Sequence, residues 1–121
     1  MRGASAIQKL LQELPRAPVR VFLVWERVLW SDMAPPTSHV LGLLSDRRAR
    51  QLWDPGRLVA NEIHRALRQR GEAVDEDGVI WDEVILYPPG ARWDGALPPA
   101  AYSGSPVVSV LEAVRGRLPA E

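Results

Sequence analysis

The sequence predicts one α/β domain, a three-layer sandwich in which helices cover both faces of a central mixed sheet of about four strands. Two segments predict the sheet: residues 19–30 and 79–87 are each apolar on both faces of an extended chain, as is typical of strands covered on both sides. Segments with helical periodicity alternate with them, which favours parallel neighbouring strands. The length, 121 residues, is that of a single domain.

Residues 1–18 are expected to form a helix and a lead-in to the first strand, before a core that spans 19–117. Over residues 5–14, apolar side chains recur at the spacing of one helix face, and Ser5 can cap this helix. These apolar residues are Ile7, Leu10, Leu11 and Leu14. Pro15 and Pro18 then end the helix.

Between the two strong strands the pattern predicts a helix, a weaker strand and a second helix. Thr37 or Ser38 can cap a helix that carries the apolar residues of 40–44, and residues 48–54 resemble a strand. The next helix is expected to begin at Pro55, with Asp54 as its N-cap, and to run to about residue 70.

After the second strong strand, the sequence predicts a hairpin and a final helix. Pro88, Pro89 and Gly90 form a turn, and residues 91–93 are expected to return as a short partner strand. Residues 94–106 are rich in Pro, Gly, Ser and Ala, which indicates a surface loop, and residues 107–117 suggest the last helix.

Composition excludes several classes of function. Lys plus Arg and Asp plus Glu are 15 each, so no net charge attracts the chain to nucleic acid or anionic lipid. The chain contains no cysteine, which excludes disulfides, thiolate nucleophiles and cysteine-ligated metals. We expect a cytoplasmic protein, because neither a signal peptide nor a membrane span is recognisable.

The order of elements resembles the thioredoxin fold. The segment VILY-PPG-ARW is similar to the family's third strand, tight turn and fourth strand, and VFLVW is similar to the strand that precedes the redox loop. In redox-active members that loop carries W-C-x-x-C. Here Ser31 and Ala34 take the places of the two cysteines, and the family's proline before the third strand is missing. The resemblance therefore implies a non-redox member.

Ligands of open α/β sheets tend to bind beyond the carboxyl ends of the parallel strands. Two segments follow such ends, and their helix N-termini could present N–H groups to an anion. The candidate ligand-binding residues are Trp30, Ser31, Asp32, Trp53, Asp54 and Arg57. The alternative is that Asp54 and Thr37 only cap their helices.

Other polar residues give weaker signals. Glu26, Asp82 and Glu83 interrupt apolar strands, so each is either buried for a function or paired with an arginine. His39 and His64, the latter expected to be exposed, lack a second ligand at metal-binding spacing, so we expect no metal and no cofactor.

Trp25 and Trp81 alternate with core positions and are expected to be packed, whereas the three tryptophans at the ends of elements either line a cleft or close off the sheet.

Three hypotheses for function remain from the sequence. The first is a non-catalytic, thioredoxin-like module that binds a protein partner or a small ligand, with self-association through the N-terminal helix or residues 88–106. The second is a cysteine-independent enzyme that uses Asp32, Asp54 and Arg57. The third is a structural subunit of a larger complex. An enzyme is the less favoured interpretation.

Overall fold

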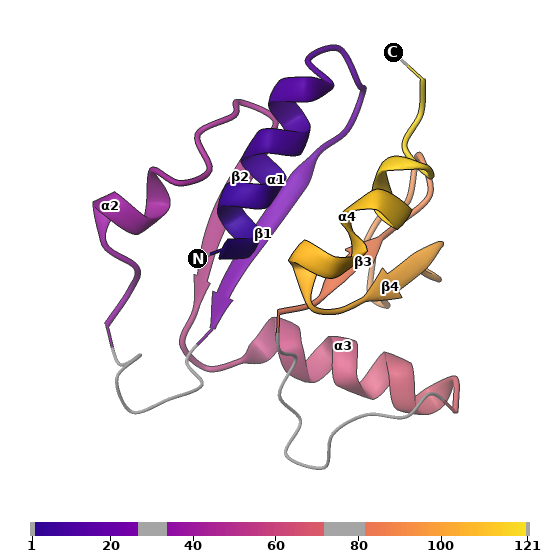
Figure 1. The fold of residues 1–121 in the computed structure, drawn as a ribbon. Helices are drawn as coiled ribbons and strands as arrows, with labels where there is room; N and C mark the ends of the chain where they lie inside the picture. Colours follow the sequence, from indigo (N-terminus) through magenta and orange to yellow (C-terminus); the bar gives the residue numbers. More distant parts are fainter. Residues whose placement is uncertain (1, 27–33, 72–81, 121) are drawn as a thin grey trace.

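A computed structural model describes residues 2–26, 34–71 and 82–120 of the chain (Figure 1). Its helices and strands follow each other in the order that the sequence predicts. The elements are α1 (Arg2–Glu13), β1 (Val21–Glu26), α2 (Ser38–Leu41), β2 (Ala49–Asp54), α3 (Leu58–Gln69), β3 (Val84–Leu86), β4 (Tyr102–Gly104) and α4 (Val107–Arg115).

Within the described residues, the strands form two small sheets of two strands each, and the predicted four-stranded central sheet is not shown. Strands β1 and β2 pair in parallel, from Val21 opposite Ala49 to Glu26 opposite Asp54. Strands β3 and β4 pair antiparallel, with Ile85 opposite Ser103. The parallel pair and the hairpin are the two kinds of connection that the sequence predicts.

Helix α1 covers one face of the β1–β2 sheet. Val21, Leu23 and Trp25 alternate along β1 and pack against a buried cluster that includes Leu11 of α1 and Leu44 of the loop before β2. Leu11 is the most deeply buried side chain of the described chain, with 2% of its surface exposed. The core of this half of the molecule therefore lies between α1 and the sheet.

The prediction that β1 is covered on both faces is wrong at the opposite face. Phe22 is 60% exposed, and Leu52, which lies on the same face of β2, is 47% exposed. Side chains alternate between the faces of a strand, so α1 cannot reach these residues. Helix α3 does not cover them either, because it lies beyond the carboxyl ends of β1 and β2 and runs under β3 and β4 (Figure 1).

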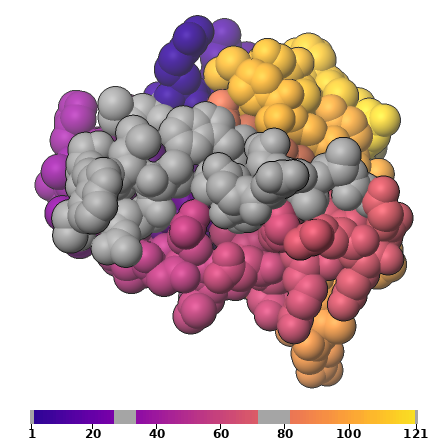
Figure 2. Space-filling view, turned by 90° about the horizontal axis from the view of Figure 1, so that it is seen from below, coloured from indigo at the N-terminus to yellow at the C-terminus, as the bar shows by residue number. Residues whose placement is uncertain are grey.

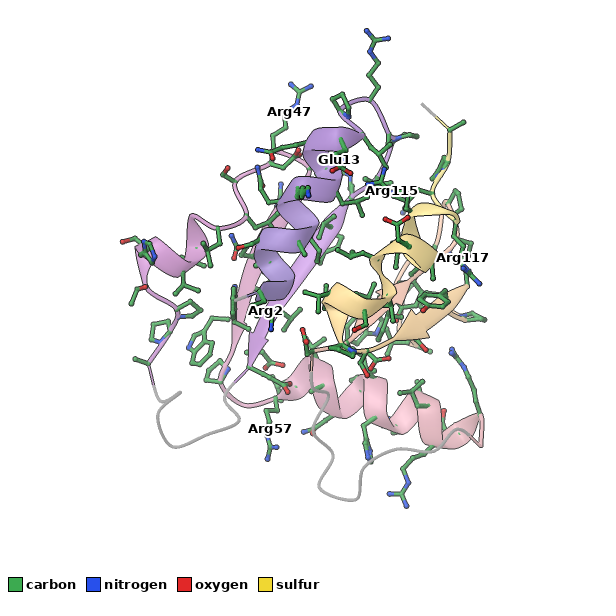
Figure 3. The ribbon with its side chains drawn as sticks, in the orientation of Figure 1. Arg2, Glu13, Arg47, Arg57, Arg115 and Arg117 are labelled. Carbon is green, nitrogen blue, oxygen red and sulfur yellow. The ribbon has the colours of Figure 1, made fainter. Side chains whose placement is uncertain are left out.

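Helix α4 packs on α1 and also on both strands of the hairpin. Near the start of α1, a Cβ atom on Gly3 would lie 3.1 Å from Cβ of Val107, so glycine allows the two helices to approach closely. At the other end of α1, Glu13 forms an ion pair with Arg115 of α4 (Figure 3). One helical layer therefore joins the two halves of the fold.

The sequence interpretation is wrong about the start of α1 and about the partner strand of β3. Helix α1 begins at Arg2, so Ser5 lies inside it and does not cap it. The strand that pairs with β3 is β4, at residues 102–104, and not residues 91–93. The signals for strands and helices come from neighbouring residues in the sequence, whereas the partner of β3 depends on which later segment of the chain comes back beside it. A longer loop, drawn in orange, projects beyond α3 before that return (Figure 2).

Candidate functional site

The carboxyl ends of β1 and β2 were the predicted location of a ligand. Three of the candidate residues, Trp30, Ser31 and Asp32, lie outside the described part of the chain, as does Trp81. Trp53 and Asp54 end β2, and Arg57 precedes α3. The structure therefore describes the half of this site that β2 and α3 contribute.

Asp54 caps α3 from a distance. Its carboxylate accepts hydrogen bonds from the backbone N–H groups of Leu58 at 2.9 Å and Val59 at 2.8 Å. The side chain is buried, with 7% of the residue exposed. A capping carboxylate satisfies N–H groups of the first turn and interacts favourably with the helix dipole. It also occupies the position that an anionic ligand would take.

The predicted start of this helix at Pro55 is wrong, because α3 begins at Leu58. Pro55 and Gly56 lie in a turn that the N–H of Arg57 closes by donating to the carbonyl of Asp54 at 3.2 Å. Arg57 has a left-handed backbone, with φ of 54°. The turn allows Asp54 to remain in the strand while its carboxylate reaches the helix. Thr37, in contrast, caps α2 as predicted, accepting from the N–H of Val40 at 3.3 Å.

Glu26 lies directly opposite Asp54 in the parallel register. Its Oε1 atom is buried and has no hydrogen-bond partner in the described chain. Burial raises the pKa of this carboxyl group, the positive charge of Arg57 lowers it, and the negative charge of Asp54 raises it further. Two carboxylates therefore share this end of the sheet, while the side chain of Arg57 extends away from the ribbons of both strands (Figure 3).

The tryptophans have different surroundings. Trp25 is half-buried, and its indole N–H donates to Oε1 of Gln51 on the neighbouring strand at 2.8 Å. Trp53 is half-buried opposite Trp25 in the register. Trp93 is 48% exposed in the loop before β4. Trp25 is therefore packed in the sheet, as the sequence predicts.

A cavity of about 210 Å³ lies between α3 and the hairpin. From α3 it is lined by Ile63, Ala66, Leu67 and Arg70; from the hairpin and its loop, it is lined by Ile85, Tyr87, Leu97, Ala100, Tyr102 and Ser103. Sequence reasoning missed it, because the hairpin partner was expected at 91–93. The available signal was the apolar stripe of α3, at positions 63, 66 and 67, facing a strand with alternating apolar residues.

Arg70 and Tyr87 supply polarity to this cavity. Nη2 of Arg70 donates to the carbonyl of Pro98 at 3.1 Å, which ties the guanidinium to the loop before β4. Burial raises the pKa of the Tyr87 hydroxyl, and the positive charge of Arg70 opposes that rise. The cavity thus combines an apolar body with a cation and hydroxyl groups, a combination that is typical of small-molecule sites.

Neither histidine belongs to the described lining of the cavity. His39 is exposed in α2, and His64 in α3 is half-buried, not exposed as the sequence suggested. Across residues 2–26, 34–71 and 82–120, no group of three His, Asp or Glu side chains is placed to hold a metal ion. None of the described helices is both long and apolar enough to cross a bilayer.

Comparison of the chain with protein-family models, curated proteins and solved structures finds no match.

Proposed function

We propose that this protein is a non-redox module with a thioredoxin-like arrangement that binds a small molecule in the cavity between α3 and the β3–β4 hairpin. The observation that carries the proposal is the cavity itself, about 210 Å³ in volume and lined mainly by apolar side chains. The absence of cysteine from the sequence removes the dithiol chemistry of the redox-active thioredoxins. Binding, without electron transfer, is what the remaining chemistry supports.

The thioredoxin-like part of the proposal is supported by the order of the elements. After α1, a parallel β–α–β unit is followed by a helix, an antiparallel hairpin and a last helix. Helix α4 packs on α1 and on the hairpin, so both small sheets lie beneath the same helical layer. In the proposed arrangement, β3 lies beside β1 and the two sheets are halves of one.

The chemistry of the cavity wall supports an organic ligand over a bare ion. The face of α3 contributes Ile63, Ala66 and Leu67, and the hairpin contributes Ile85. This part of the wall contacts apolar atoms, and removing an apolar ligand surface from water contributes about 25 cal/mol per Å². A hydrated ion would gain nothing from this apolar part of the wall.

The test is a titration with toluene, a neutral ring of suitable size, followed by nuclear magnetic resonance. We expect toluene to shift the amide resonances of α3 and the hairpin in a saturable way. Filling the cavity by Ala66→Phe should abolish the shifts. If the Ala66→Phe protein does not fold, Ala66→Leu takes its place and should weaken the shifts. Gln69→Phe introduces the same ring on an exposed position of the same helix and should leave binding unchanged.

Absence of saturable shifts in the folded wild-type protein would overturn the proposal. Unchanged toluene binding in a folded Ala66→Phe protein would overturn it as well, because the ligand would then lie elsewhere.

A further inference from the structure

The cavity opens to solvent on one side, and its enclosed part has room for a single ring. A cavity of about 150 Å³ lined by apolar side chains accepts benzene, and this one has about 210 Å³. The additional volume corresponds to about two water molecules at liquid density. It therefore has space for a ring with one small substituent, and is smaller than the range of about 300–1,000 Å³ that drug-sized ligands occupy.

One residue of the described cavity wall, Arg70, carries a positive charge. Arg70 lines the cavity together with apolar and hydroxyl side chains, and no Asp or Glu belongs to the described lining. Its one recorded hydrogen bond, to the carbonyl of Pro98, leaves most of its five N–H donors available. An anionic substituent would meet this cation without facing a like charge on the described wall.

The geometry of a guanidinium favours a carboxylate as that substituent. A guanidinium presents two parallel N–H groups that match the two oxygens of a carboxylate, and such charge-assisted bonds are about twice as strong as neutral ones. The hydrogen bond to Pro98 restrains the Arg70 side chain at the edge of the cavity, so less freedom is lost when a ligand binds. Tyr87 lines the same cavity, and a tyrosine hydroxyl group can donate a further hydrogen bond.

We infer that the cavity binds a small aromatic carboxylic acid, with its ring against Ile63, Ala66 and Leu67 and its carboxylate on Arg70. This inference rests on the proposed function, because it specifies the ligand of the same cavity. It differs from the candidates of the sequence interpretation, which lie at the ends of β1 and β2. Arg70 is then the residue that determines specificity for an acid over a neutral analogue.

The experiment compares benzoate with benzamide, which has the same ring and nearly the same shape but no charge. Calorimetric titration of the wild-type protein at neutral pH should show benzoate binding about two- to fivefold more tightly than benzamide, because Arg70 is exposed and water weakens its ion pairs. Arg70→Gln should remove that preference and leave toluene binding intact, while Arg70→Lys should retain part of it, because lysine keeps the charge without the fork. Arg68→Gln, an exposed arginine of the same helix outside the cavity lining, is the matched control.

The outcomes separate the inference from the proposal on which it rests. Equal affinity for benzoate and benzamide in a protein that binds toluene would overturn the inference and leave the cavity as a neutral binding site. A preference for benzoate that persists in Arg70→Gln would also overturn it. Failure of toluene and both other ligands to bind would instead remove the proposed function.

Discussion

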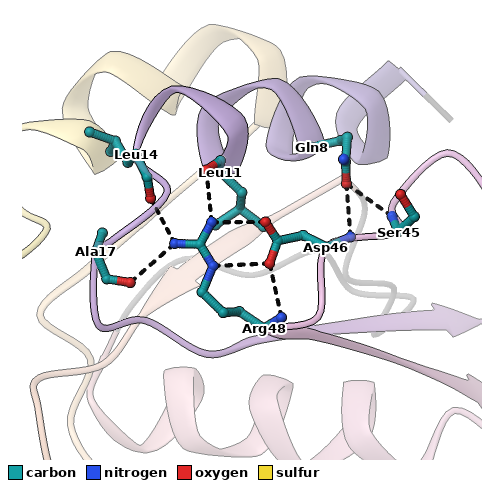
Figure 4. Close-up of polar contacts among 7 residues, drawn as sticks. All are labelled: Gln8, Leu11, Leu14, Ala17, Ser45, Asp46 and Arg48. Atoms are coloured by element: carbon teal, nitrogen blue, oxygen red, sulfur yellow. Dashed lines mark hydrogen bonds and ion pairs between the residues drawn. The ribbon is translucent and has the colours of Figure 1, made fainter.

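Asp46 and Arg48 form a two-point ion pair beneath the C-terminal end of α1 (Figure 4). Nε of Arg48 donates to Oδ1 of Asp46 at 2.9 Å, and Nη2 donates to Oδ2 at 2.8 Å. The same guanidinium donates to the backbone carbonyls of Leu11 at 2.7 Å, Leu14 at 2.7 Å and Ala17 at 3.1 Å. One side chain therefore serves the Leu11 carbonyl in the last turn of α1 and adds a second hydrogen bond to the carbonyls of Leu14 and Ala17, which also accept from backbone N–H groups.

This cluster joins α1 to the loop that leads into β2. Gln8 of α1 accepts hydrogen bonds from the backbone N–H groups of Ser45 and Asp46, at 2.9 Å and 3.1 Å. The carbonyl of Arg48 accepts from the N–H of Val21 at 3.0 Å, which is the first contact between β1 and the chain entering β2. The polar cluster thus sets the position of α1 over the parallel sheet.

We predict that Arg48→Met destabilises the protein by about 2–3 kcal/mol, measured by urea denaturation. Removing one partner of a buried ion pair costs about 3–5 kcal/mol. The side chains of Arg48 and Asp46 are still 16% and 15% exposed to solvent. The expected cost therefore lies at or below the lower end of that range. Arg47→Met is the control, because Arg47 is exposed and points away from the fold (Figure 3). A loss equal to that of the control would show that the cluster contributes nothing.

The ion pair also predicts how stability depends on pH. Hydrogen bonds from Arg48 lower the pKa of Asp46 from 3.8 to about 2. Because the folded-state pKa is the lower one, the contribution of Asp46 is fully present above about pH 4 and is lost as pH falls towards 2. Asp46→Asn should therefore be less stable than wild type at pH 7, and the two should converge near pH 2.

Thermal unfolding followed across this pH range measures the difference. Asp94→Asn, which changes an exposed aspartate in the loop before β4, is the control and should follow wild type throughout. A difference between Asp46→Asn and wild type that stays constant down to about pH 2 would contradict the assignment.

Local sequence signals predicted much of the fold. Strands β1 and β2 and the capping of α2 by Thr37 follow from patterns of neighbouring residues. The alternation of helices and strands also follows, except that the partner strand of β3 was expected at residues 91–93 and not at 102–104. The error at Asp54 arose because its side chain forms hydrogen bonds with an element that is not directly adjacent to it in the sequence. Asp54 was assigned as an adjacent N-cap, but its carboxylate reaches α3 across a turn whose left-handed residue, Arg57, no local pattern indicates.

The cavity depended on a pairing that sequence periodicity cannot specify. Its wall requires β4 at residues 102–104, which places Ser103 beside Ile85 on one face of the hairpin. The short segment from 102 to 104 has no run of alternating apolar residues, and its strand forms only because it pairs with β3. The apolar stripe of α3 is visible in the spacing of Ile63, Ala66 and Leu67 in the sequence, but no local pattern indicates the surface opposite that stripe.

Glu26 provides a test of the polar end of the β1–β2 sheet. Its buried Oε1 atom has no hydrogen-bond partner in the described chain, and burial raises the pKa of its carboxyl group above 4.5. A raised folded-state pKa means that stability is greatest below the unfolded-state pKa and is lost as pH rises through the folded-state value. The ionised side chain therefore destabilises the folded protein at neutral pH.

We predict that Glu26→Gln stabilises the protein at pH 7 by about 1 kcal/mol. This value is the lower end of the cost of an unsatisfied buried group, and we choose it because the Glu26 side chain is only partly buried. The gain should disappear below about pH 4, where wild-type Glu26 is protonated. Urea denaturation at both pH values measures it, and Glu112→Gln, whose side chain is 88% exposed, is the control. A Glu26→Gln protein that is less stable than wild type at pH 7 would contradict the prediction, because the carboxylate would then stabilise the folded protein.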